Sequence, residues 1–155
     1  MIIGNRTDFF VQLDVVMKDE EEHWVWGIFN FWIDDIPYPG RGRDITFNVA
    51  PYHLVCDYED MLNYEFDGSN LPLEQIDFQN ENHLFDRTAG ELEDYGLQTK
   101  FEIVGDTLRF FYSQNGGAWQ LKEIPLAYYE SIIKKLDELC KENFKSLLDD
   151  RFNDN

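Results

Sequence analysis

The first third of the chain alternates apolar and polar positions in a way that predicts two β-strands. Residues 8–17 form the first strand, one face of which carries Phe9, Val11, Leu13 and Val15. Residues 23–33 form a longer aromatic strand that is apolar on both faces, which is typical of a central strand covered on both sides. The charged turn at residues 18–22 indicates that the two strands pair as a hairpin.

Three of the four tryptophans lie on this second strand. One face of the strand carries Trp24, Trp26, Ile28 and Trp32, and the other carries Val25, Phe29, Phe31 and Ile33. Such a run could line a ligand pocket. We interpret it as core instead, because large aromatic side chains at period two suit the interior between a sheet and its helices.

The middle of the chain reads as a loop, a short strand and a helix. Prolines and glycines mark residues 34–43 as a loop, and residues 44–50 are a candidate for a short strand. Pro51 suits the first turn of a helix. The residues that recur at helical spacing after it are Leu54, Val55, Tyr58, Met61 and Leu62. Residues 67–96 lack periodicity, which predicts loops with short elements.

The last third predicts a three-stranded meander followed by a long helix. The strands cover residues 99–104, 107–113 and 118–124. Asn115-Gly116 indicates a type I′ turn, whose two central positions both need positive φ. A helix over residues 125–148 carries an apolar stripe made of Tyr129, Ile132, Ile133, Leu136, Leu139, Cys140, Phe144 and Leu147.

Together these elements predict the α+β class. The expected architecture is an antiparallel sheet with a mid-chain helix and a long C-terminal helix packed on it. The strands near the two ends of the chain must then share one sheet or stack as two. We expect a single domain over residues 1–155, because no repeat or low-complexity linker divides the sequence.

Negative charge is concentrated in the middle of the chain. The formal net charge is −18, and residues 44–99 hold 13 Asp and Glu against one basic residue, Arg87. Such a field repels nucleic acid and anionic membranes, and it attracts basic partners. With 43% hydrophobic and 16% aromatic residues, the sequence is that of a folded protein and not of a disordered acidic tail.

Targeting signals are not visible. The start of the chain lacks a basic segment followed by a long apolar run, and no apolar stretch reaches the roughly 18 residues that span a bilayer. Cys56 and Cys140 form no CxxC motif, which fits a reducing compartment. We therefore expect a cytoplasmic protein.

The sequence contains no self-sufficient catalytic or metal-binding motif. His23, His53 and His83 lack the spacing of metal ligands. Residues 57–60 and 65–68 resemble fragments of a calcium loop, but the alternating ligand pattern is missing. No phosphate-binding glycine loop or nucleophile elbow is present. We expect neither enzymatic activity nor a cofactor, with a carboxylate-dependent hydrolase as the least favoured alternative.

Both ends of the chain resemble a known family. The stretches concerned are Met1-Ile2-Ile3-Gly4-Asn5, Thr7-Asp8-Phe9, residues 26–33, Glu123-Ile124-Pro125, Tyr129 and Ile133. They resemble bacterial immunity proteins of family 42, which are small, acidic, cytoplasmic proteins encoded beside polymorphic toxins, including those of contact-dependent growth inhibition. The resemblance implies a protein that binds and neutralises a cognate toxin domain, and it assigns no contact residues.

We predict that the contact surface uses the acids of the mid-chain helix, of the loop after it and of a later rim. The residues are Asp57, Glu59, Asp60, Tyr64, Glu65, Asp67, Glu91, Glu93 and Asp94, with Tyr64 as an aromatic anchor. The expected partner is the C-terminal domain of a toxin with a basic surface, and nuclease toxins are one class that fits. The main alternative is an acidic nucleic-acid mimic that inhibits a DNA-binding protein.

Overall fold

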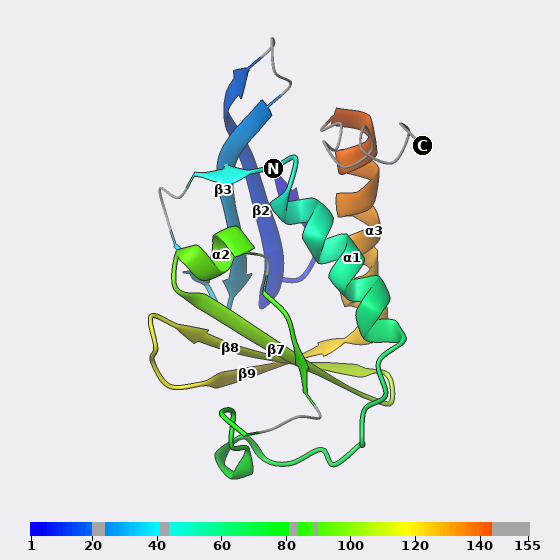
Figure 1. Ribbon diagram of the computed structural model, residues 1–155. Helices are drawn as coiled ribbons and strands as arrows, with labels where there is room; N and C mark the ends of the chain where they lie inside the picture. Colours follow the sequence, from blue (N-terminus) through cyan, green and yellow to red (C-terminus); the bar gives the residue numbers. More distant parts are fainter. Residues whose placement is uncertain (20–23, 41–43, 81–83, 89, 144–155) are drawn as a thin grey trace, which may run out of the picture.

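The computed structural model describes residues 1–19, 24–40, 44–80, 84–88 and 90–143. Within these ranges the chain forms a five-stranded sheet, a four-stranded sheet and three α-helices (Figure 1). All strand pairs are antiparallel, so the predicted α+β class is confirmed. The strands from the two ends of the chain do not share one sheet, and each end builds its own.

The first sheet is built around the predicted hairpin. Its strands are β1 (Ile2–Ile3), β2 (Phe9–Asp19), β3 (Trp24–Ile33), β4 (Ile36–Tyr38) and β5 (Ile45–Thr46). The order is β1-β2-β3-β4, and β5 also pairs with β3. Gly27 of β3 is required at this crossing, because a Cβ there would lie 2.0 Å from the Asp14 carbonyl oxygen and 2.6 Å from the Phe47 ring.

The second sheet is the predicted C-terminal meander with one short strand added. Its order is β6 (Phe85–Asp86), β7 (Leu97–Val104), β8 (Thr107–Gln114) and β9 (Gln120–Pro125). Asn115 and Gly116 have φ of 53° and 69°, which confirms the predicted positive-φ turn. The third strand begins at Gln120 and not at residue 118, because Gly117 lengthens the loop and its N–H donates to the Gln114 carbonyl.

Helices α1 (Ala50–Leu62) and α3 (Leu126–Asn143) pack against each other beside the first sheet (Figure 1). The apolar stripe of α3 is buried from Tyr129 to Cys140, as predicted. The predicted stripe residues Phe144 and Leu147 lie outside the described residues. Of the predicted strand 44–50 only β5 forms, because Ala50 already belongs to α1, where Pro51 occupies the first turn.

Aromatic rings join the two sheets to the helices. The ring of Phe110, on β8, lies 5.7 Å from Phe9 and 5.3 Å from Phe31 of the first sheet. Tyr129 of α3 lies 6.2 Å from Phe9, 5.8 Å from Tyr58 of α1 and 6.3 Å from Phe101 of β7. Elements distant in sequence therefore share one core.

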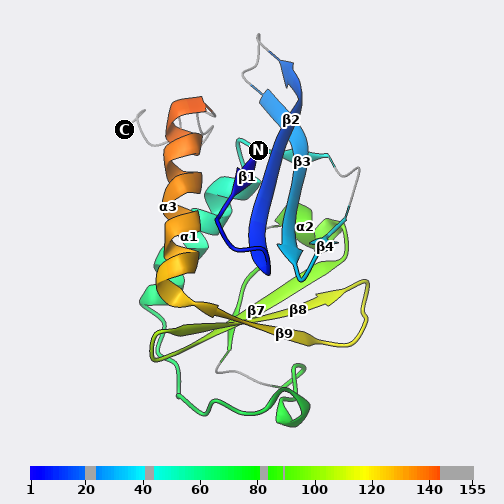
Figure 2. The same cartoon turned by 180° about the vertical axis from the view of Figure 1, so that it is seen from behind.

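The tryptophans of β3 are not in that core, which corrects the sequence interpretation. The buried face of β3 carries Val25, Phe29, Phe31 and Ile33. Trp24, Trp26 and Trp32 are half-buried on the opposite face of the strand. In Figure 2, α1 and α2 (Gly90–Asp94) lie behind β2 and β3. Trp24 and Trp26 stack on each other at 6.1 Å, and the Trp32 indole N–H donates to Gln12.

Val15 was also expected on the buried face of β2, and that expectation is wrong. Phe9, Val11 and Leu13 are buried as predicted, but Val15 is exposed. A β-bulge interrupts the register between Val15 and Met17, so two residues of β2 meet one of β3. Val16 is the extra residue, and Val15, which still pairs with Gly27, is where the alternation of burial ends.

The irregular segment 67–80 covers the outer side of the second sheet (Figure 1). It contains the short 3₁₀ turn η1 (Leu73–Gln75). Beneath it, Arg109 and Glu102 form a buried ion pair at 2.7 Å, and the backbone of Asn70 and Leu71 supplies a further donor and acceptor. These hydrogen bonds compensate for the cost of burying two charges. The sequence of the segment did not indicate this role.

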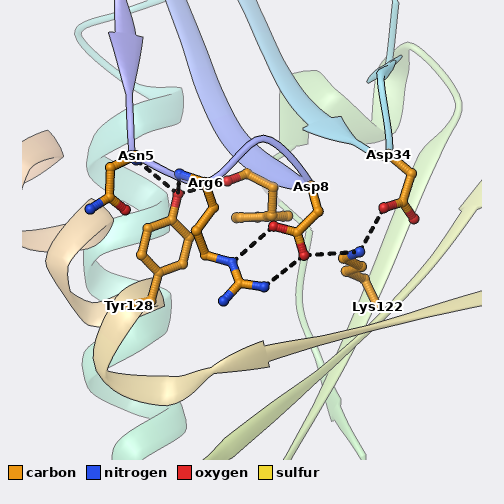
Figure 3. Close-up of polar contacts among 7 residues, drawn as sticks. Asn5, Arg6, Asp8, Asp34, Lys122 and Tyr128 are labelled. Carbon is orange, nitrogen blue, oxygen red and sulfur yellow. Dashed lines mark hydrogen bonds and ion pairs between the residues drawn. The ribbon is translucent and has the colours of Figure 1, made fainter.

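A polar junction connects the N-terminal segment to both sheets (Figure 3). The Tyr128 hydroxyl accepts the N–H groups of Asn5 and Arg6 at 3.2 Å and donates to the Phe9 carbonyl at 2.7 Å. Lys122 of β9 contacts Asp8 at 3.2 Å and Asp34 at 2.6 Å. Burial lowers the pKa of Lys122, but the ion pairs with Asp34 and Asp8 outweigh burial, and the net shift of the Lys122 pKa is upward. The hydrogen bond from Arg6 lowers the pKa of Asp8.

We expect Tyr128→Phe to lower the free energy of unfolding by about 1–3 kcal/mol, because the Phe9 carbonyl and two backbone N–H groups lose a partner. Urea unfolding measures this change. The comparison variant is Arg6→Gln, which keeps the backbone N–H and the hydroxyl contacts of Tyr128 and removes the guanidinium that pairs with Asp8 and lies near the Tyr128 ring. An unchanged midpoint for Tyr128→Phe would show that the hydroxyl does not hold the junction.

Candidate partner-binding surface

The acidic face of α1 follows from its amphipathic sequence. Leu54, Val55, Tyr58 and Met61 are buried against the core, so the positions between them point away from it. Glu59 and Asp60 are exposed there, as predicted. The described helix ends at Leu62, and the Asn63 N–H closes it by donating to the Asp60 carbonyl.

Asp57 lies on the same helix but faces inward. Its carboxylate is 3.9 Å from the Arg87 guanidinium, and its side chain is only 19% exposed. Burial raises the pKa of Asp57, while Arg87 and His53 oppose that shift. Arg87 is the basic residue of the acidic segment 44–99. The structure therefore uses it to compensate for a partly buried carboxylate.

The loop after α1 contains one aromatic residue with internal contacts and two exposed acids. The Tyr64 ring lies 4.9 Å from Phe66 and 5.5 Å from Phe85, and it is half-buried against the core. Glu65 and Asp67 are exposed, and Asp67 accepts the Ser69 N–H at 2.8 Å in an Asx turn. Only part of the Tyr64 ring is therefore available to a partner.

Helix α2 carries the predicted acidic rim. The Glu91 carboxylate accepts the Thr46 N–H at 2.8 Å, and the Tyr95 hydroxyl donates to the Asp44 carbonyl at 2.9 Å. These bonds attach α2 to β5, which neither sequence pattern nor spacing indicated. Glu93 and Asp94 are exposed. Helices α1 and α2 lie on the same side of the first sheet, in front in Figure 1.

The nine predicted residues thus divide into two groups. Glu59, Asp60, Glu65, Asp67, Glu93 and Asp94 are exposed on α1, its loop and α2. Asp57, Tyr64 and Glu91 are half-buried and help to hold these elements in place. Sequence reasoning did not identify the exposed apolar run Val15-Val16-Met17 as a surface feature. Its signal was three consecutive apolar residues where strict alternation would place a polar one.

A polar cavity of about 640 Å³ opens between the second sheet and the segment that covers it. Its charged side chains are Asp86, Arg87, Glu93 and Lys100, and the Lys100 amine is engaged by Asp86 at 3.2 Å and by the Phe78 carbonyl at 2.9 Å. Phe78 and Trp119 stack on its wall at 4.4 Å. The charges in this cavity balance, in contrast to the acidic surface of α1 and α2.

Among the described residues, no group of three or more His, Cys, Asp or Glu side chains could hold a metal ion. In the same part of the chain, no helix has the length and apolar character needed to cross a membrane.

Comparison with solved structures shows a fold shared with a protein named CdiI. The crystal structure of CdiI from Burkholderia dolosa AUO158 aligns with a TM-score of 0.56 and 14% sequence identity, over 92% of this chain and 100% of that one. No match was found among the curated proteins. The family model of immunity protein 42 matches residues 1–139. The chain therefore belongs to the immunity protein 42 family.

Replacing Asp57 tests whether its partial burial costs stability. A raised pKa means that protonation favours the folded state, so Asp57 stabilises most below its ordinary pKa and this contribution is lost as the pH rises through the raised value. Asp57→Asn does not titrate. We expect its free energy of unfolding, relative to the unmodified protein, to increase between about pH 4 and pH 7.

Urea unfolding at several pH values measures that difference. Glu59→Gln is the control, because Glu59 is exposed on the same helix, and its effect should stay within about 0.5 kcal/mol throughout. A difference for Asp57→Asn that does not vary with pH would contradict the assignment of a costly buried carboxylate.

Proposed function

We propose that this protein binds a cognate antibacterial toxin domain and neutralises it in the cytoplasm, without catalysing a reaction. The observation that carries the proposal is membership of the immunity protein 42 family over residues 1–139. The fold shared with CdiI supports the same class. Neutralisation by binding requires complementary surfaces and slow dissociation, and it requires no chemistry from the inhibitor.

Charge supports a basic partner. With a net charge of −18, the chain attracts a positively charged domain and accelerates its encounter at low ionic strength. Nuclease toxins are one class that fits, because a cleft that binds phosphates is itself basic. An acidic inhibitor either occupies that cleft or covers a surface beside it, and both would exclude the substrate.

The acidic surface that we propose for this contact comprises the exposed acids of α1, its loop and α2. Glu59 and Asp60 would meet the partner from α1, with Glu65 and Asp67 beside them and with Glu93 and Asp94 on the rim. Asp57, Tyr64 and Glu91 would support these elements from below through their internal contacts. Packing so many carboxylates together costs self-repulsion, which a basic partner would relieve.

Growth rescue tests the function directly. The toxin domain encoded beside this gene is expressed in a sensitive bacterium with and without the present chain. We expect the chain to restore growth and to co-purify with the toxin domain. Continued killing without co-purification would overturn the proposed function. Rescue without stable binding would instead overturn neutralisation by complex formation.

Charge reversal tests the acidic surface. We expect Glu59→Lys with Asp60→Lys to slow association with the toxin domain and to flatten its salt dependence, because steering charges act mainly on the association rate. Stopped-flow mixing at several salt concentrations measures both. The control is Glu74→Lys with Asp106→Lys, which changes the net charge equally at two exposed sites on other elements. Equal effects of both double variants would contradict a localised surface.

A further inference from the structure

Beyond Leu13, β2 has a free edge in the part of the chain that the structure describes. Strand β1 pairs with Val11 and Gln12, and the Leu13 N–H donates to the Met1 carbonyl at 2.9 Å. From Asp14 onward, the only described strand that pairs with β2 is β3, on its other side. We call the side of residues 14–18 that faces away from β3 the outer edge of β2.

The backbone of Val15 has hydrogen-bonding groups directed to this outer edge. In an antiparallel strand, the N–H and C=O of alternate residues point to the same side. Leu13 points its N–H toward β1, so Val15, two residues later, points its N–H and C=O the same way. The bulge follows only after Val15, between it and Met17.

Between Asp14 and Lys18, the side chains along this edge are apolar and accessible. Val15, Val16 and Met17 are 51%, 61% and 57% exposed. On the neighbouring strand, Met17 lies opposite Trp26, which stacks with Trp24. The ends of β2 and β3 project beyond the start of α1 in both views (Figures 1 and 2). Proteins usually protect an edge of this kind with charge, proline, a β-bulge or a covering segment, because it invites pairing with another strand. In β2 the bulge and Lys18 come after Val15, so Val15 precedes both.

We propose that the outer edge of β2 accepts a β-strand of the basic toxin domain, which thereby extends the first sheet. This inference rests on the proposed function and specifies how the partner is held. Backbone hydrogen bonds to Val15 supply the attachment, as in other cases of strand addition. The apolar side chains of Val16 and Met17 supply contact area at the same place.

The negative charge of this chain favours a basic strand at the outer edge of β2 over a second copy of the chain. The hairpin sequence, residues 9–33, contains five acidic residues and one lysine. Two copies joined at this edge would bring together two such hairpins and two chains of −18. A strand flanked by Lys or Arg meets attraction at the same place.

The acidic surface and the outer edge would then have separate roles. The acids of α1 and α2 govern encounter, since long-range charge acts on the association rate. Backbone pairing and apolar contact govern dissociation, because they form only after the partner has docked. Substitutions at the edge should therefore change the dissociation rate and leave the salt dependence of association unaltered.

The first test removes one outward N–H. Val15→Pro abolishes that donor and leaves the β2–β3 pairing in place, since proline is tolerated on edge strands. Val15→Thr is the matched control, because it keeps both the N–H and the β-branched shape. The probe is the toxin domain encoded beside this gene, stripped from its co-purified complex with denaturant and refolded. We expect Val15→Pro to raise the dissociation rate at least tenfold and Val15→Thr to change it less than threefold.

The second test needs no substitution. Amide hydrogen exchange of the unmodified chain is compared with and without the toxin domain, over the peptide that covers residues 14–19. Strand addition predicts that the Val15 N–H becomes strongly protected in the complex. This measurement decides the question even where Val15→Pro does not fold, as checked by circular dichroism.

The outcomes separate the edge from the function. Suppose that the unmodified chain rescues growth and binds tightly, that Val15→Pro dissociates at the wild-type rate, and that the Val15 N–H gains no protection. These results would overturn strand addition at the outer edge of β2 and leave the proposed function standing. No binding by the unmodified chain would overturn both. A dimer of the free chain that Val15→Pro dissociates would assign the edge to a second copy and overturn the proposal.

Discussion

The structure depends on the aromatic contacts where its two sheets meet. Phe110 lies within 6 Å of Phe9 and Phe31, at 5.7 and 5.3 Å, and Tyr129 brings α3 into the same cluster. Each such pair contributes about 0.5–1.5 kcal/mol beyond the area it buries. Neither sheet encloses a core alone, because each has one apolar face that must be covered. The cluster therefore holds the N-terminal hairpin, the C-terminal meander and both long helices in one arrangement.

Once that core is formed, the surface can carry an unusual concentration of carboxylates. Some of them are engaged structurally: Asp57 faces Arg87, Glu91 holds α2 to β5, and Glu102 is buried with Arg109. A few acids therefore hold helices and strands in place through these contacts. The other acids of α1, its loop and α2 are exposed. Self-repulsion among the exposed acids costs stability that local structure does not recover. Under the proposed function, a basic partner would compensate for that repulsion.

The hairpin of the first sheet shows how one irregularity changes the use of a surface. The alternation that buries Phe9, Val11 and Leu13 ends at Val15, and a bulge follows between Val15 and Met17. Beyond it, the strand leaves β1 and the helices and exposes apolar side chains beside a stacked pair of tryptophans. In the proposed mode of binding, the acidic helices would act at long range and the apolar strand edge would act on contact.

The sequence by itself determined the strands of the hairpin and the meander and the positive-φ turn at Asn115-Gly116. It also determined the apolar stripe of α1 up to Met61 and that of α3 up to Cys140, whereas Leu62, predicted in the first stripe, is exposed. These are local properties, since period and turn chemistry act over a few residues. Local sequence patterns could not predict the short elements between residues 67 and 96, because hydrogen bonds between residues far apart in the sequence hold them. Examples are the bond from the Thr46 N–H to Glu91 and the bond from Arg109 to the Leu71 carbonyl. The sequence could not distinguish exposed Glu59 from inward-facing Asp57, because both are acidic residues of the same helix. Only tertiary packing decided which face of the aromatic strand entered the core and which acids remained at the surface, because burial depends on what the rest of the chain brings to each position.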